Sequence, residues 1–205
     1  MFALVESGSI TQMPKGNKGI QIGDVKYPAA IYTLWSEADR NAIGIYTVEI
    51  DNTNKKDEEY YINTNISYAF SAGKVTGSYG TATARSLTDP VYTSEDNSRN
   101  LIPDGKSIGD KKADGLKTIK KNLISRQCYN LLQDSDWMVV KAEETESAMD
   151  SGWKTWRASI RTKCNSMQTQ IDNASDVDAL AALFIYTEQD DGSITRPLGE
   201  FPEKE

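Results

Sequence analysis

The stretch WKTWRASIRTKCNSMQTQI, from Trp153 to Ile171, decides the architecture of this chain. Its large apolar residues recur at steps of three and four, which is the spacing of one face of an amphipathic helix. They are Trp153, Trp156, Ile160, Cys164, Met167 and Ile171. Such a face serves packing, so the stretch predicts a long helix at 148–172 that requires a partner.

A second apolar stripe earlier in the chain offers that partner. It comprises Leu116, Ile119, Leu123, Ile124, Cys128, Leu131 and Leu132. We expect the acid-rich segment between the two stripes to be a loop. A short third helix is expected at 176–184, capped by Ser175 or Asp176. Residues 111–186 therefore predict an antiparallel helical hairpin with a short third helix.

The first 86 residues favour β-structure, because their apolar segments are rich in β-branched and aromatic residues. The strand-like segments are Ile45–Ile50, Tyr60–Phe70 and Lys74–Tyr79. Ser71–Gly73 fits the turn between the last two. Ser36 and Asp39 are expected to cap a short helix that ends at Gly44.

The remaining segments are polar. Residues 87–110 are rich in proline, glycine and asparagine, which indicates a linker. Residues 187–205 form an acidic tail that carries four of the seven surplus negative charges. We therefore expect an α+β chain with an N-terminal β-rich domain (1–86), a linker, the C-terminal antiparallel helical hairpin (111–186) and the tail.

The composition is that of a soluble globular protein, with 38% hydrophobic and 26% charged residues. Neither a membrane span nor a signal peptide is expected. The chain has no histidine, which excludes catalysis through imidazole. Lys106 and Ser107 echo the end of a phosphate-binding loop, but Asn100 stands where that loop needs glycine. We expect no catalytic residue, no cofactor and no metal site, and hence no enzyme.

The chain has two cysteines, Cys128 and Cys164, and both fall on the apolar side of the expected helices. This position favours buried thiols in a reducing cytosol over the alternative of a disulfide.

Several short motifs point to a family. Leu131-Leu132 followed by Asp136-Trp137, and then Trp153-x-x-Trp156-Arg157-x-x-x-Arg161, resemble the C-terminal pattern of tail-fibre assembly-type proteins of tailed bacteriophages. Gly23–Pro28 and Trp35–Ile45 look like an extended segment and a short helix that occur in many small phage tail proteins.

The resemblance implies a non-enzymatic phage tail protein, a virion component associated with the tail fibre or baseplate that mediates fibre attachment or assembly. It would be assembled in the host bacterial cytoplasm. Its expected partners are other tail or fibre proteins in a homo- or hetero-oligomeric assembly. An assembly chaperone absent from the mature particle is the alternative. The candidate partner-binding residues are Trp137, Trp153, Trp156, Arg157 and Arg161.

Two further hypotheses come from other classes of protein. A glycan-binding protein for host recognition would need an exposed platform formed by Tyr60, Tyr61, Tyr68 and Tyr79. A nucleic-acid site would rest on the basic cluster between Lys111 and Arg126. Nucleic-acid binding is the weaker hypothesis, because the rest of the chain is acidic and a solvated helix face accounts for such a cluster.

Overall fold

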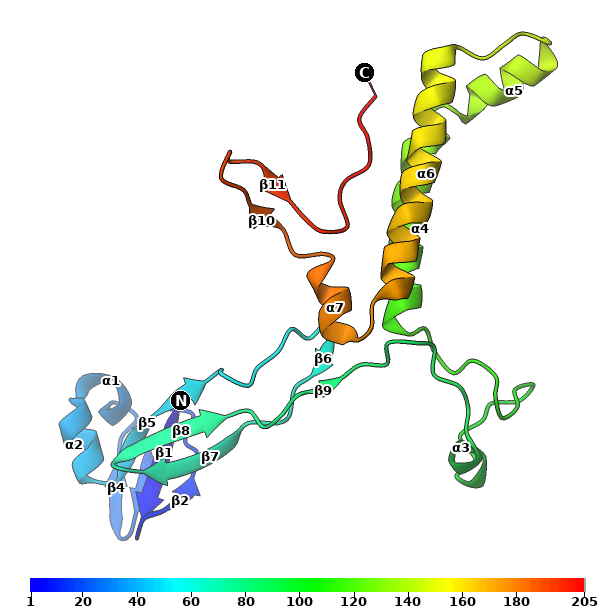
Figure 1. Cartoon of the computed structure of the whole chain (residues 1–205). Helices are drawn as coiled ribbons and strands as arrows, with labels where there is room; N and C mark the ends of the chain where they lie inside the picture. Colours follow the sequence, from blue (N-terminus) through cyan, green and yellow to red (C-terminus); the bar gives the residue numbers. More distant parts are fainter. Residues whose placement is uncertain (205) are drawn as a thin grey trace. The chain divides into compact units, whose positions relative to one another are not determined.

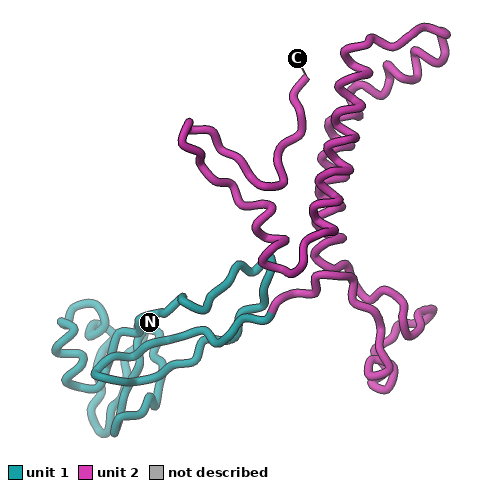
Figure 2. Tube along the Cα trace, viewed as in Figure 1, with its two compact units in different colours: residues 1–83 teal, residues 84–205 magenta. Residues whose placement is uncertain are grey.

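The computed structural model describes residues 1–204, which divide into two compact units, the first covering 1–83 and the second beginning at Ala84 (Figure 2). The first unit is β-rich and the second is mainly helical (Figure 1). The α+β class and the order of its parts are therefore confirmed.

The first unit contains eight strands and two short helices before strand β9 (Thr83–Ala84), which spans the boundary between the units. In chain order these are β1 (Phe2–Glu6), β2 (Ser9–Gln12), β3 (Ile20–Ile22), β4 (Val25–Tyr27), α1 (Ile31–Leu34), α2 (Glu37–Ala42), β5 (Ile45–Asp51), β6 (Tyr61–Ile62), β7 (Ser67–Ser71) and β8 (Lys74–Ser78). The predicted cap of α2 is confirmed, since the Asp39 amide donates to Ser36 Oγ at 3.2 Å. Gly44 follows that helix with a φ of 84°, a conformation that glycine adopts without strain.

Five strands of this unit form one sheet in the order β2-β1-β5-β8-β7. Neighbouring strands are antiparallel except β5 and β8, which run parallel with Val48 opposite Val75. The edge strands β2 and β7 approach each other, so the sheet curls towards a barrel. The predicted turn between β7 and β8 is confirmed, with Ala72 and Gly73 both at positive φ, as a tight hairpin requires.

The sheet has apolar packing on both faces, as β1 shows most clearly. Leu4 joins a cluster with Ile31 and Ile45 on the side covered by α1 and the β3–β4 hairpin. The neighbouring Ala3 points the other way and packs with Val48 and Val75 inside the curl. Alternate residues of one strand thus supply two separate cores.

The second unit is built around two long antiparallel helices, as predicted. Its elements are α3 (Ser94–Ser98), α4 (Leu116–Gln133), α5 (Asp136–Glu144), α6 (Ser151–Asn173), α7 (Val177–Ala182), β10 (Thr187–Glu188) and β11 (Ile194–Thr195). Asp176 caps α7, because its carboxylate accepts from the Ala179 amide at 2.8 Å. The expectation of a loop between the long helices is wrong in part, since α5 occupies most of that segment. None of the helices in residues 1–204 combines the length and apolarity that a membrane span requires.

The segment that precedes α4 is held by carboxylates. Asp96 joins the capping box of α3 and lies 2.6 Å from Lys112 Nζ. The Lys112 ammonium and the Thr93 amide hold the pKa of Asp96 well below its usual range, at about 2. Asp89 accepts from the Gly115 amide at 2.7 Å and pairs with Lys111, and its pKa is also lowered to about 2. The expected linker therefore contains a capped helix tied to the start of α4.

Candidate functional site

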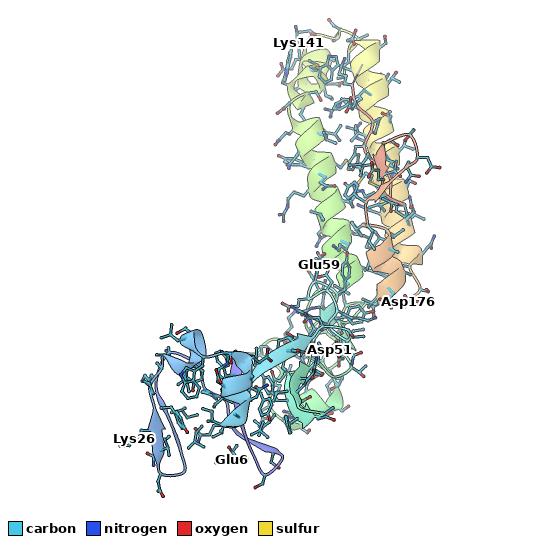
Figure 3. All side chains as sticks on the ribbon, turned by 90° about the vertical axis from the view of Figure 1, so that its left-hand side faces the viewer. Glu6, Lys26, Asp51, Glu59, Lys141 and Asp176 are labelled. Atoms are coloured by element: carbon cyan, nitrogen blue, oxygen red, sulfur yellow. The ribbon has the colours of Figure 1, made fainter. Side chains whose placement is uncertain are left out.

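Helices α4 and α6 pack along their length, and α5 lies at one end of this pair. Figure 3 labels Lys141 of α5 at that end and Asp176 at the other. Every fourth residue of α4 is buried, and the predicted α6 residues Ile160, Cys164, Met167 and Ile171 are buried against them. The buried α4 residues are Leu116, Lys120, Ile124, Cys128 and Leu132.

Three residues expected in the α4 stripe are exposed instead. They are Ile119, Leu123 and Leu131. The buried residues of α4 are spaced four apart and form one narrow line along the helix. The single facing helix α6 covers only this line. The place of Ile119 in the line is taken by Lys120, whose Nζ lies 4.4 Å from the centre of the Phe184 ring.

The turn from α4 to α5 is held by Arg157, which reaches across from α6. Its side chain is buried and donates to the Leu132 carbonyl at 2.7 Å and to Ser135 Oγ. Its other terminal nitrogen lies 2.5 Å from Asp136 Oδ1 at the first residue of α5. Arg157 thus fixes where α5 begins and in which direction it leaves the pair.

Helix α5 carries apolar side chains around its whole circumference, yet none of its residues is buried. Trp137 is 57% exposed, Val139 45% and Val140 55%. Soluble helices normally turn their apolar side chains towards a core. Exposure on this scale, gathered in one short helix, is typical of a surface that another molecule covers.

A cleft of about 420 Å³ opens between α5, the following loop and the start of α6. Trp137 and Met138 line it from α5, and Met149 and Trp153 line it from the opposite side. Lys141 also lines it, with its Nζ 5.8 Å from the centre of the Trp137 ring. The cleft is therefore mainly apolar, and its lining includes one cation, Lys141, and one carboxylate, Asp150.

We call α5, the loop that follows it and the start of α6 the tip of the hairpin. The outer edge of this tip is acidic. Glu143 and Glu144 end α5, and Glu146 follows in the loop. All three side chains are exposed. An apolar surface with such an edge favours a partner that carries lysine or arginine around its own apolar contact residues.

The other two tryptophans of this region are packed against each other and against the end of the chain. The rings of Trp153 and Trp156 meet edge to face, with centres 5.5 Å apart. Trp156 Nε1 donates to the Pro202 carbonyl at 3.0 Å. Lys204 Nζ lies 4.6 Å from the centre of the Trp153 ring. Both rings are half-buried.

Residues 196–204, which we call the strap, run along α6. Lys163 Nζ donates to the Leu198 carbonyl at 3.1 Å, and Leu198 itself is fully buried. Contacts to Trp156 and then Trp153 follow nearer the tip. The acidic tail predicted at 187–205 is therefore a short β10–β11 hairpin followed by a packed segment.

The five candidate residues have different surroundings. Trp137 and Arg161 are exposed, Trp153 and Trp156 are half-buried, and Arg157 is buried. The structure brings Trp137 and Trp153 to one cleft, whereas Arg157 does not line it and holds Asp136 at the start of α5. Sequence reasoning missed Val139, Val140 and Met149. The run of four apolar residues from Trp137 to Val140 is the signal that could have identified α5.

The platform of exposed tyrosines that the glycan hypothesis requires is not formed. Tyr60 and Tyr61 are buried, at 5% and 9% exposure. Tyr68 packs against the core inside the curled sheet, and Tyr79 is half-buried with Lys55 Nζ 5.8 Å from its ring centre.

The basic cluster before and within α4 is largely engaged inside the chain. Lys111 pairs with Asp89 and Asp114, and the Asp114 carboxylate contributes most to raising the pKa of Lys111. Lys121 pairs with Asp172 at 2.8 Å, and Lys117 donates to the Asp172 carbonyl. These lysines therefore make internal contacts at the surface of the helix pair, and the Lys111 side chain remains 45% exposed.

Within residues 1–204, no group of three or more cysteine, aspartate or glutamate side chains is arranged to hold a metal ion. Comparison with known proteins adds nothing to this picture: no family model matches the chain, and no curated protein or solved structure is significantly similar to it.

Proposed function

We propose that this chain is a non-enzymatic protein of a bacteriophage tail, a virion component associated with the fibre or baseplate, which binds a partner protein through the tip of its helical hairpin. The observation that carries the proposal is helix α5, whose tryptophan and valines are exposed although they are apolar. The assignment to a phage tail rests on the resemblance of the hairpin motifs to tail-fibre assembly-type proteins.

The surroundings of α5 support a protein partner over a small ligand. The cleft beside α5 is open to solvent, and the exposed valines do not line it. A small molecule in the cleft would leave Val140 uncovered, whereas a helix or strand of another protein could cover Trp137 and Val140 together, since these residues lie one turn apart on α5. The acidic edge favours a partner segment that combines apolar and basic residues.

The role of Arg157 fits this proposal. Protein contacts need a preorganised surface, since ordering a mobile segment on binding costs affinity. The hydrogen bonds from Arg157 to Leu132 and Asp136 hold α5 in place before any partner arrives. Arg157 is thus a positioning residue for the tip rather than part of its contact surface.

The test is a quantitative mass spectrometric comparison of purified phage particles with the lysate from which they came. A tail component is expected in the particles at a fixed ratio to the other tail proteins. An assembly chaperone would be present in the lysate and lost from mature particles. Absence from both the particles and their assembly intermediates would overturn the proposal.

Matched variants then test the tip. Val140→Ser combined with Trp137→Ser removes two of the exposed apolar side chains of α5, which lie one turn apart, and we expect particles that lack this chain or its fibre. Ile119→Ser combined with Leu123→Ser changes exposed apolar residues of α4 and serves as the control. Equal loss in both variants, with both proteins folded, would contradict a binding site at the tip.

A further inference from the structure

Two thiols face each other inside the interface of α4 and α6. Cys128 is 9% exposed and Cys164 is 7% exposed. Both are free, and Cys128 is a neighbour of the Cys164 thiol. The expectation of buried thiols is therefore confirmed, and their contact is a feature that the sequence pattern did not show.

The register of the helix pair explains this contact. Nearer the tip, Arg157 of α6 donates to the Leu132 carbonyl of α4 at 2.7 Å. Towards the other end, the Gln168 amide of α6 donates to Ser125 Oγ of α4 at 2.9 Å. The two cysteines lie between these contacts, each on its own helix. The same Gln168 amide lies 3.6 Å from Cys164 Sγ, which ties the thiol pair to the register.

We propose that Cys128 and Cys164 form a modification site, at which a low-molecular-weight disulfide such as oxidised glutathione converts the thiol pair into a disulfide between α4 and α6. This proposal does not depend on the function of the tip. It rests on the register of the helix pair, because the contacts on either side of the thiols place Cys128 opposite Cys164.

The reaction proceeds in two exchanges. One cysteine loses its proton and its thiolate attacks a sulfur of oxidised glutathione, forming a mixed disulfide and releasing one glutathione thiolate. The second cysteine, also deprotonated, attacks the protein sulfur of that mixed disulfide and releases the other glutathione thiolate. The two protons end on the two glutathione molecules. Two electrons pass from the cysteines to glutathione, which is reduced.

Burial makes the exchange slow. It raises the pKa of Cys164 to about 11, assisted by the neighbouring Cys128, so the reactive thiolate is scarce at neutral pH. The glutathione molecule also needs the helices to part before it reaches either sulfur. An equilibrium measurement is therefore the suitable test, because it does not depend on how fast the thiols react.

The experiment equilibrates the full chain in buffers of reduced and oxidised glutathione, once under native conditions and once in guanidinium chloride. Each equilibrium is approached from the reduced and from the oxidised protein. Mass spectrometry after acid quenching measures the disulfide and identifies the linked peptides. The free energy by which a disulfide stabilises the fold equals the free energy by which folding favours the disulfide. We therefore expect the equilibrium constant for disulfide formation to be roughly 30- to 1,000-fold larger in the native chain than in the chain unfolded by guanidinium chloride.

Cys128→Ser and Cys164→Ser are the controls, and neither variant is expected to give an internal bridge. A native equilibrium constant equal to or below that of the unfolded chain would overturn the proposal. It would also fail if native protein accumulated only glutathione adducts or dimers linked between chains. The two serine variants distinguish these products by mass.

Discussion

Arg157 and Asp136 form an ion pair of unequal burial, with Nη2 of the arginine 2.5 Å from Oδ1 of the aspartate. The arginine side chain is 5% exposed, and the aspartate side chain is 54% exposed. The arginine also satisfies the Leu132 carbonyl, whereas water reaches the carboxylate. The two residues therefore contribute unequally to the stability of the hairpin.

This inequality gives the first prediction. Arg157→Ala is expected to lower the free energy of unfolding by about 2–4 kcal/mol, because it leaves buried acceptors without a donor. Asp136→Ala should lower it by less, since the buried Arg157 guanidinium keeps its bonds to the Leu132 carbonyl and the Ser135 hydroxyl. Urea unfolding followed by circular dichroism measures both. The exposed Arg161→Ala is the control, and equal losses for Arg157 and Asp136 would contradict this account.

The second prediction concerns acid. The pKa of Asp96 is lowered to about 2 in the folded chain from an ordinary value of 3.8, so its ionised form stabilises the fold. This contribution is complete above the ordinary pKa and is lost as the pH falls through about 2. Asp96→Asn should therefore melt below the unmodified protein at neutral pH, and the difference should shrink between pH 3.8 and about 2. Melting curves across this range measure it, and a difference that persists at the lowest pH would refute the assignment.

The third prediction concerns the strap. Leu198 is fully buried, and its amide donates to the Leu183 carbonyl at 3.1 Å. The Leu198 carbonyl accepts from Lys163 Nζ. Leu198→Ala should cost about 2–4 kcal/mol through lost burial and the cavity it leaves. Leu101→Ala, at an exposed position of the same unit, should change stability by less than about 1 kcal/mol. Denaturant unfolding compares the two, and similar effects would mean that the strap is not packed as described.

The fourth prediction concerns Gly115, at the N-cap of α4. Its φ of −78° suits any residue, but an added Cβ would overlap the backbone of Thr88. Gly115→Ala should therefore be strongly destabilising, by about 2 kcal/mol or more, because backbone must move. Gly152→Ala is the matched change near the start of α6, where the added Cβ meets only an Asp150 carboxylate oxygen at 3.2 Å. Thermal melting of the two variants should separate them clearly.

The long helices were predictable because their pattern is periodic and local. Met167 and Ile171 are fully buried where steps of three and four placed them. The same reasoning overestimated the buried face of α4. The predicted stripe is wide enough to face several elements, whereas α4 packs mainly against α6. Ile119 and Leu123 satisfy the period and still lie outside the contact.

Helix α5 and the role of Arg157 were not predictable in this way. Trp137 to Val140 are four consecutive apolar residues, which show neither helical nor strand period. Arginine side chains are usually exposed. The groups that accept hydrogen bonds from the buried Arg157 lie more than twenty positions earlier in the chain. Such a contact depends on the register of two helices, which a single sequence does not specify.

The grouping of tryptophans at the tip gives the molecule an intrinsic optical reporter. Trp137, Trp153 and Trp156 belong to this end of the hairpin, and the remaining tryptophan, Trp35, lies in the β-rich unit. Replacing Trp35 with phenylalanine would leave all indole emission at the tip. A partner that covers Trp137 would then shift the emission to shorter wavelength, so binding could be titrated on the unlabelled protein.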